Sequence, residues 1–152
     1  MNLEAQDSIS EEYALEQFLR EKSLLVVNPK RKNGIILIKK YYAEFAGPGA
    51  VIGGCFDQDV CDAIALGKLS LLKPKNYEER RRAYLLRRQW VRLMKQITDN
   101  PIPRQRAQII LNQFEHWFDR ETAAKIPDEV FALMVGVFPE TIAGARDIVN
   151  RF

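Results

Sequence analysis

The longest regular pattern in the sequence lies in the middle of the chain, at Asn76–Ile97. Apolar side chains recur there at spacings of three and four residues, which places them on one face of a helix: Ala83, Leu86, Trp90, Leu93 and Ile97. Four cations form a second stripe on another side: Arg81, Arg88, Arg92 and Lys95. We therefore predict a long helix that packs on one face and carries positive charge on another.

The residues at the start of the chain predict a helix followed by two strands. A helix is expected over residues 11–22, and Ser8 and Glu11 have the spacing of a capping box. β-branched runs at residues 24–27 and 35–38 predict strands. An Asn-Gly pair just before the second run predicts a tight turn, so the two strands are expected to form a hairpin.

The segment between this hairpin and the long helix is less regular. Residues 39–45 are expected to extend the second strand. The glycine-rich segment 47–54 lacks the Lys-Ser/Thr pair of a P-loop and misses the dinucleotide-binding spacing by one residue. We interpret it as a connection with a tight turn. A helix is predicted over residues 57–72, with Asp57 as its N-cap and Pro74 beyond its end.

After the long helix, the two prolines within residues 98–103 predict a break and a subdomain boundary. Everything beyond it has helical periodicity, with expected helices at residues 104–118, 121–125, 128–135 and 139–151. The predicted fold class is therefore α+β and mostly α. Residues 1–99 would form a mixed α/β region that includes the basic helix, and residues 100–152 a unit of three main helices.

Charge is distributed unevenly along the chain. The 23 Lys and Arg against 20 Asp and Glu give a net charge of only +3. Residues 73–106, however, carry a net charge of +8, and the rest of the chain carries −5. Such asymmetry is typical of a site for a polyanion, although a solvated face that neutralises acidic neighbours has the same pattern. Three more cations, at 30–32, lie in the predicted hairpin turn.

The sequence indicates no catalytic chemistry. Its two cysteines match no zinc-ligand spacing, and its one histidine, His116, has no nucleophile or carboxylate partner in the pattern around it. We therefore predict a non-enzymatic protein without a metal or cofactor. The first residues are acidic and polar, unlike a signal or transit peptide, and no apolar run is long enough to span a bilayer. A cytoplasmic location is expected.

Residues 128–147, DEVFALMVGVFPETIAGARD, resemble the helix-turn-helix of bacterial transcription regulators of the Crp/Fnr class. Ala132 provides the small residue where the second helix crosses the first, and Gly136 provides the turn residue that tolerates positive φ. Ile142 would pack in the core. The resemblance implies that residues 104–118 form a supporting helix and that the second helix of the motif lies in the major groove.

The outward positions of that second helix carry few groups that read bases. They are Phe138, Pro139, Glu140, Ala143, Gly144 and Asp147. Base edges are read mainly by Arg, Lys, Asn and Gln. Donors are offered nearby by Arg146, Asn150 and Arg151.

Two functions follow from these features. The first is a nucleic-acid-binding, transcription-regulator-like protein, whose basic helix neutralises phosphates while the helix-turn-helix docks on DNA. The second is an interaction or assembly module, whose basic helix binds an acidic protein. Its C-terminal unit would contact a partner or a second copy of the chain through Phe138. A homodimer is compatible with this second function. Tyr84 and Trp90 could stack on bases, or pack in the core with the other apolar residues of the helix.

The candidate nucleic-acid-binding residues are Lys30, Arg31, Lys32, Arg80, Arg81, Arg87, Arg88, Arg92, Lys95, Thr141, Arg146 and Asn150.

Overall fold

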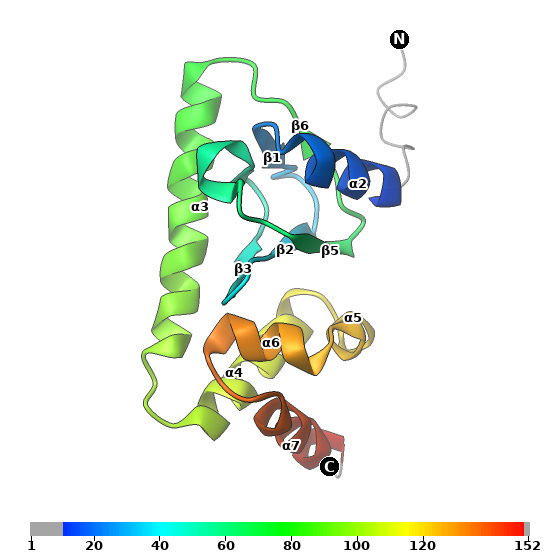
Figure 1. The fold of residues 1–152 in the computed structure, drawn as a ribbon, viewed down its shortest axis with the longest axis vertical. Coiled ribbons are helices and arrows are strands. Elements are labelled where there is room, and N and C mark those ends of the chain that lie inside the picture. Colours follow the sequence, from blue (N-terminus) through cyan, green and yellow to red (C-terminus); the bar gives the residue numbers. More distant parts are fainter. Residues whose placement is uncertain (1–10, 151–152) are drawn as a thin grey trace.

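A computed structural model describes residues 11–150 of the chain, so the predicted cap at Ser8 and the last two residues lie outside the described part. It confirms a mixed α+β fold in which helices predominate (Figure 1). The short strands gather beside one half of a long helix, and the C-terminal helices gather at its other end. The helices are α2 (Glu11–Glu21), α3 (Tyr77–Thr98), α4 (Pro103–Trp117), α5 (Arg120–Lys125), α6 (Asp128–Val135) and α7 (Pro139–Asn150).

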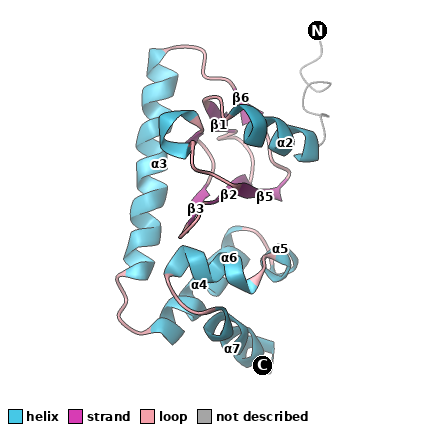
Figure 2. Cartoon of the chain, in the orientation of Figure 1, coloured by secondary structure: helices cyan, strands magenta, loops and turns pink. Residues whose placement is uncertain are grey.

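The strands, drawn in magenta in Figure 2, are short. They form two three-stranded antiparallel sheets, with the orders β4-β1-β6 and β3-β2-β5. A single turn of 3-10 helix, η1 (Gly54–Asp57), separates the fourth strand from the fifth. The strands are β1 (Leu25–Val27), β2 (Asn33–Ile38), β3 (Ala43–Ala46), β4 (Val51–Ile52), β5 (Asp62–Gly67) and β6 (Leu71–Leu72).

The predicted hairpin between the first two strands is wrong, because β1 and β2 belong to different sheets. Asn33 does not form a hairpin turn with Gly34 but begins β2, and its side chain is fully buried. Its amide donates to the carbonyls of Asn28 and Arg31, both at 3.0 Å, and its Oδ1 accepts from the backbone N–H of Ser70 at 3.0 Å. Asn33 thus fixes the loop that takes the chain from one sheet to the other.

Two further predictions for the N-terminal half are wrong. Residues 39–45 do not extend β2: the chain turns back, with the N–H of Lys39 bonded to the carbonyl of Tyr42 at 2.9 Å, and β3 follows. Residues 57–72 form β5 and β6 instead of a helix. A short apolar run is compatible with either structure, and here the pairing of β5 with β2 along six residues decides for a strand.

The predicted basic helix is confirmed as α3, and it connects the two parts of the chain. Asn76 caps it by accepting a hydrogen bond from the N–H of Glu79 at 2.9 Å, and Glu79 accepts one from the N–H of Lys75 at 2.7 Å. The helix contacts β3 and β4 at one end and α4 and α6 at the other. The predicted subdomain boundary falls in the short connection between α3 and α4.

One hydrophobic core crosses that boundary. Phe45 of β3 lies at its centre, with its ring centroid 5.0 Å from that of Phe114 and 5.2 Å from that of Trp90. Trp117 stacks on Phe45 at 5.4 Å and meets Trp90 edge-on at 5.3 Å. Gly47 makes this packing possible, since a Cβ on it would lie 2.3 Å from the indole ring of Trp90. Trp90 is therefore a packing residue and is not free to stack on bases.

The helices α4, α5, α6 and α7 form near the positions predicted for them. Gly136 ends α6 with left-handed angles, φ 68° and ψ 45°, as the sequence predicts for this turn. Ala132 of α6 and Ile142 of α7 are both buried, and the two helices pack against each other. Arg106 of α4 donates to the carbonyls of Val135 (2.9 Å) and Gly136 (3.1 Å), which satisfies acceptors at the end of α6. Among the described residues, no helix has the length and apolar character needed to cross a membrane.

Trp90→Ala should lower the free energy of unfolding by about 3–5 kcal/mol, because it removes the aromatic side chain that packs against Phe45 and Trp117. Urea titration followed by the fluorescence of Trp117 measures this. Tyr77→Ala is the control on the same helix, since Tyr77 is 70% exposed. An unchanged urea midpoint for Trp90→Ala would contradict the packing described above.

Ala132→Leu should lower the free energy of unfolding by about 1–3 kcal/mol, because the larger side chain has no room between α6 and α7. Thermal melting followed by circular dichroism measures the effect. Ala124→Leu on the exposed side of α5 is the control and should melt like the parent protein. If both variants melt at the same temperature, the close approach of α6 and α7 at Ala132 is refuted.

Candidate nucleic-acid interface

The outer face of α3 carries a line of cations. Ala83, Met94 and Ile97 are the buried residues of this helix. Four exposed cations lie on the side away from them, within a sector of about 60° at 3.6 residues per turn. This basic stripe consists of Arg81, Arg88, Arg92 and Lys95.

Along α3 and its caps, acidic residues lie only near the two ends of the stripe, at Glu78, Glu79 and Asp99. Arg80 and Arg82 are exposed beside it, and no residue between 80 and 98 is acidic. In the described part of the chain, none of these six side chains forms an ion pair. Cations without partners on one rigid helix produce a positive potential that attracts polyanions.

Arg87 is the exception among the predicted cations of α3, because its side chain points into the protein and is only 12% exposed. It binds both carboxylate oxygens of Asp57 at 3.0 Å and Oε2 of Glu44 at 2.6 Å. It also donates to the carbonyl of Val51 at 3.0 Å. Arg87 therefore stabilises the fold internally, in place of the predicted contact with phosphate.

The charged groups around Arg87 form one network, which we call the ion cluster: Lys39, Glu44, Asp57, Asp59 and Arg87. Lys39 contributes a second buried cation, with Nζ 3.5 Å from the carboxylates of Asp57 and Asp59. Gly53 donates its backbone N–H to Asp57 at 2.8 Å. The cluster ties α3 to β3, to η1 and to the turn after β2.

These contacts shift the ionisation of the buried members. Burial alone would raise the pKa of Asp57, but the hydrogen bond and charge of Arg87, with smaller effects of Gly53 and Lys39, lower the pKa below its ordinary value. Burial acts to lower the pKa of Arg87, and its pairing with Asp57 and Glu44 raises that pKa overall. The pKa of Lys39 is likewise raised, against the effect of burial, by Glu44, Tyr42 and Asp57. Asp57, Arg87 and Lys39 are therefore charged across the neutral range.

The predicted cations at 30–32 lie in the loop that joins the two sheets. Lys32 donates from Nζ to the carbonyl of Phe118 at 2.9 Å, which anchors the loop to the junction of α4 and α5. The N–H of Lys30 bonds to Oδ1 of Asn28 at 3.0 Å, and Arg31 is half-buried. This loop is thus a separate basic element and not a continuation of the basic stripe.

Arg146 of α7 does not face outward. Its Nε bonds to Asp128 at 2.7 Å, and its other nitrogens donate to the carbonyls of Ala123 (3.2 Å) and Ile126. Its guanidinium also lies 5.3 Å from the ring centroid of Phe131. Arg146 therefore joins α5, α6 and α7, and its predicted contact with nucleic acid is replaced by this role.

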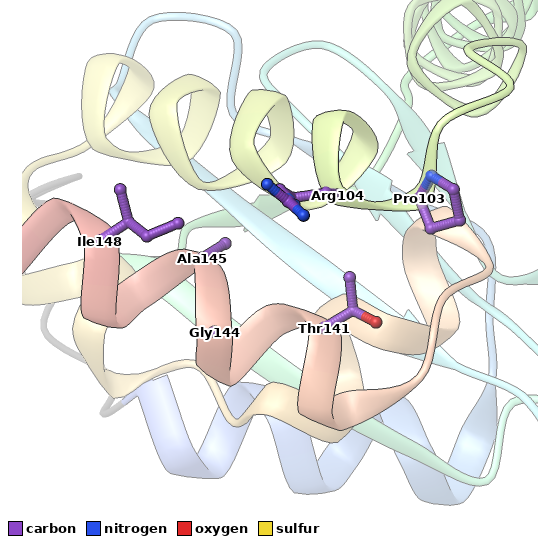
Figure 3. Close-up of a pocket in the computed structure, with 6 residues that line it drawn as sticks. All are labelled: Pro103, Arg104, Thr141, Gly144, Ala145 and Ile148. Atoms are coloured by element: carbon purple, nitrogen blue, oxygen red, sulfur yellow. The ribbon is translucent and has the colours of Figure 1, made fainter.

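The exposed side of α7 is acidic and apolar. It shows Glu140, Gly144, Asp147 and Ile148, with Phe138 just before the helix; the side chain of Asn150 is not described. Thr141 lines a shallow groove of about 370 Å³ between α4 and α7 (Figure 3). In Figure 3 the side chain of Arg104 lies across this groove from α7. No cation from the described part of α7 is available to a base edge.

Sequence patterns could not identify the residues that surround the basic stripe. Asp57 was predicted to cap a helix, and nothing in its local pattern signals a bond to Arg87, which is 30 residues away. Phe56 is 67% exposed at η1, and its ring centroid lies 6.1 Å from that of Tyr84 on α3.

The described residues contain no group of three or more His, Cys, Asp or Glu side chains that could hold a metal.

Asp57→Asn should destabilise the protein by about 3 kcal/mol near pH 7, because it leaves the buried Arg87 without its main counter-charge. The pKa of Asp57 is lowered in the folded state, so its stabilising effect is complete above the unfolded pKa of about 3.9. It is lost as the pH falls through the lower folded value.

Urea midpoints of the parent and variant, measured from about pH 7 downward, test this expectation. The difference between them should begin to shrink below about pH 4. Asp147→Asn, on the exposed side of α7, is the control and should follow the parent at every pH. A difference that stays constant into the acid range would show that Asp57 and Arg87 are not coupled.

Comparison of the chain with models of protein families, with curated proteins and with solved structures gave no match. The helix-turn-helix resemblance of residues 128–147 therefore rests on the residues themselves and on the two helices, α6 and α7, at the matching positions. Function has to be inferred from the surface of α3 and from the elements that hold it in place.

Proposed function

We propose that this chain is a non-catalytic nucleic-acid-binding protein that holds the sugar–phosphate backbone against the outer face of α3. The observation that supports this most strongly is the basic stripe, whose four exposed cations form no ion pair within the described part of the chain. Phosphate contacts of this kind provide affinity without sequence information.

The length of the stripe determines how strongly binding is expected to depend on salt. Arg81 and Lys95 are fourteen residues apart, or about 21 Å along the helix, which spans about six phosphates of one DNA strand. Four to six phosphate contacts predict a slope of about −4 to −5 in a plot of log K against log salt concentration. The affinity should then fall about 10²- to 10³-fold between 50 and 200 mM salt.

The proposal assigns no base reading to α7. Glu140 and Asp147 on its exposed side would repel phosphates, and Arg146 is occupied by Asp128. In this proposal, α6 and α7 support the end of α3 through their packing on α4, and they do not contact base edges.

A second candidate is an assembly module that binds a protein partner or a second copy of the chain. It is favoured by Phe138, which is 76% exposed, and by Ile148, which is 44% exposed beside the groove between α4 and α7. The two candidates differ in one result: the second predicts no binding to nucleic acid even at low salt.

The combined variant Arg81→Ala/Arg88→Ala/Arg92→Ala should bind labelled nucleic acid more weakly. Its salt slope should be shallower by about 0.9 for each duplex phosphate that the protein no longer neutralises. Arg87 is excluded from the variant because it supports the fold. Fluorescence anisotropy with a random duplex and a random single strand, titrated with salt, is the measurement.

The control variant Arg104→Ala/Arg120→Ala/Lys125→Ala also removes three positive charges. The three residues it changes are exposed and lie on α4 and α5. It should keep the slope of the parent. If the two triple variants weaken binding equally, the contribution of α3 is only its net charge and the proposed surface is wrong. If the parent protein does not bind at low salt, the assembly module becomes the better candidate.

A further inference from the structure

We infer that the nucleic acid is single-stranded and that its bases stack on an aromatic platform beside the basic stripe, formed by Tyr42, Phe56 and Tyr84. This inference rests on the proposed function and specifies its ligand. The platform combines residues from the turn after β2, from η1 and from α3, so it exists only in the folded chain.

Two of the three rings are in direct contact, and the third is linked to them through Lys39. The ring centroids of Phe56 and Tyr84 lie 6.1 Å apart at an interplanar angle of 74°. Nζ of Lys39 donates to the carbonyl of Phe56 at 3.1 Å and lies 3.3 Å from the hydroxyl of Tyr42. The same Nζ lies 5.2 Å from the ring centroid of Tyr42. Lys39 thus contacts both the hydroxyl of Tyr42 and the backbone of Phe56.

The platform remains open to solvent although its base is rigid. Phe56 is 67% exposed and Tyr42 42% exposed, whereas Asp57, the residue after Phe56, is fully buried and bound to Arg87. Single exposed aromatic residues are common, but grouped and rigidly held ones usually indicate a contact surface. Stacking on an aromatic face accepts any base, which suits a site that does not read sequence.

The basic stripe lies within one helical turn of the platform. Tyr84 has Arg81 three residues before it and Arg88 four residues after it, and residues at these spacings are neighbours on a helix surface. Arg80, also exposed, lies four residues before Tyr84. A nucleotide whose base covers Phe56 can therefore place its phosphate against Arg81 or Arg88.

The ion cluster favours one orientation of the strand. It holds three carboxylates against two cations, and one of them, Asp59, has a side chain that is 62% exposed. The exposed carboxylate of Asp59 repels phosphates beside η1, where Lys22 donates to the carbonyl of Gln58 at 2.6 Å, while the basic stripe on α3 attracts them. The backbone is expected to follow α3 with the bases turned toward Phe56. In a duplex the bases are stacked on one another and cannot cover such a platform.

Binding of the full chain is tested with fluorescein-labelled dT and rU strands of about 20 nucleotides, which cannot pair with themselves, and with a labelled duplex of the same length. At about 50 mM salt, a single strand should bind at least tenfold more tightly than the duplex. Phe56→Ala should weaken single-strand binding about tenfold or more and leave its salt slope unchanged, because every phosphate-binding cation is still present. The dT and rU results distinguish DNA from RNA.

Phe138→Ala is the matched control, since Phe138 is an exposed phenylalanine at the turn between α6 and α7. It should bind like the parent, and Phe56→Trp should bind single strands far better than Phe56→Ala, because it keeps an aromatic face. Circular dichroism of the variants verifies that they are folded.

Equal affinity for the duplex and both single strands, or a single-strand affinity that Phe56→Ala does not change, would overturn the aromatic platform. The proposed function would survive that result if Arg81→Ala/Arg88→Ala/Arg92→Ala still weakened binding. Failure of the parent to bind any of the three probes at low salt would overturn both.

Discussion

The bond between Arg87 and Asp57 fixes the position of α3, on which both the fold and the proposed surface depend. Burying these charges is costly, and the cost is offset because Arg87 meets two carboxylates and a carbonyl at hydrogen-bond distance. Gly53 and Lys39 supply further contacts to Asp57. The specific geometry of this pair sets the rotation of α3 about its own axis, and that rotation turns the remaining cations outward.

The aromatic core holds the same helix one turn further along. Trp90 lies one turn beyond Arg87 and meets both Phe45 and Trp117 edge-on, so β3, α3 and α4 meet at a single point. The apolar contacts are not directional, whereas the ion pair is, and together they determine both the position and the orientation of α3. The two halves of the chain consequently share the core around Phe45, although the N-terminal half also has a second cluster of its own, and they are expected to unfold together.

The sequence predicted the helices better than the strands, for physical reasons. Helix signals are local: the periodicity of α3, the cap at Asn76 and the stop at Gly136 all lie within the elements that they define. The strands depend on partners far along the chain, so neither the separation of β1 from β2 nor the strand character of residues 57–72 could be read locally. The charge asymmetry did identify α3 as the basic element. It could not show that Arg87 faces inward, because that depends on Asp57.

The proposed surface is thus the side of α3 that the core and the ion cluster leave exposed, with Phe56 at its edge. An NMR titration of the full chain with an unlabelled dT strand maps the contact directly. We predict that amide signals of residues 80–95 and of Phe56 shift on binding, while those of residues 140–147 on α7 stay in place. Shifts confined to α7, with α3 unchanged, would contradict this account and indicate that the helix-turn-helix is the binding site.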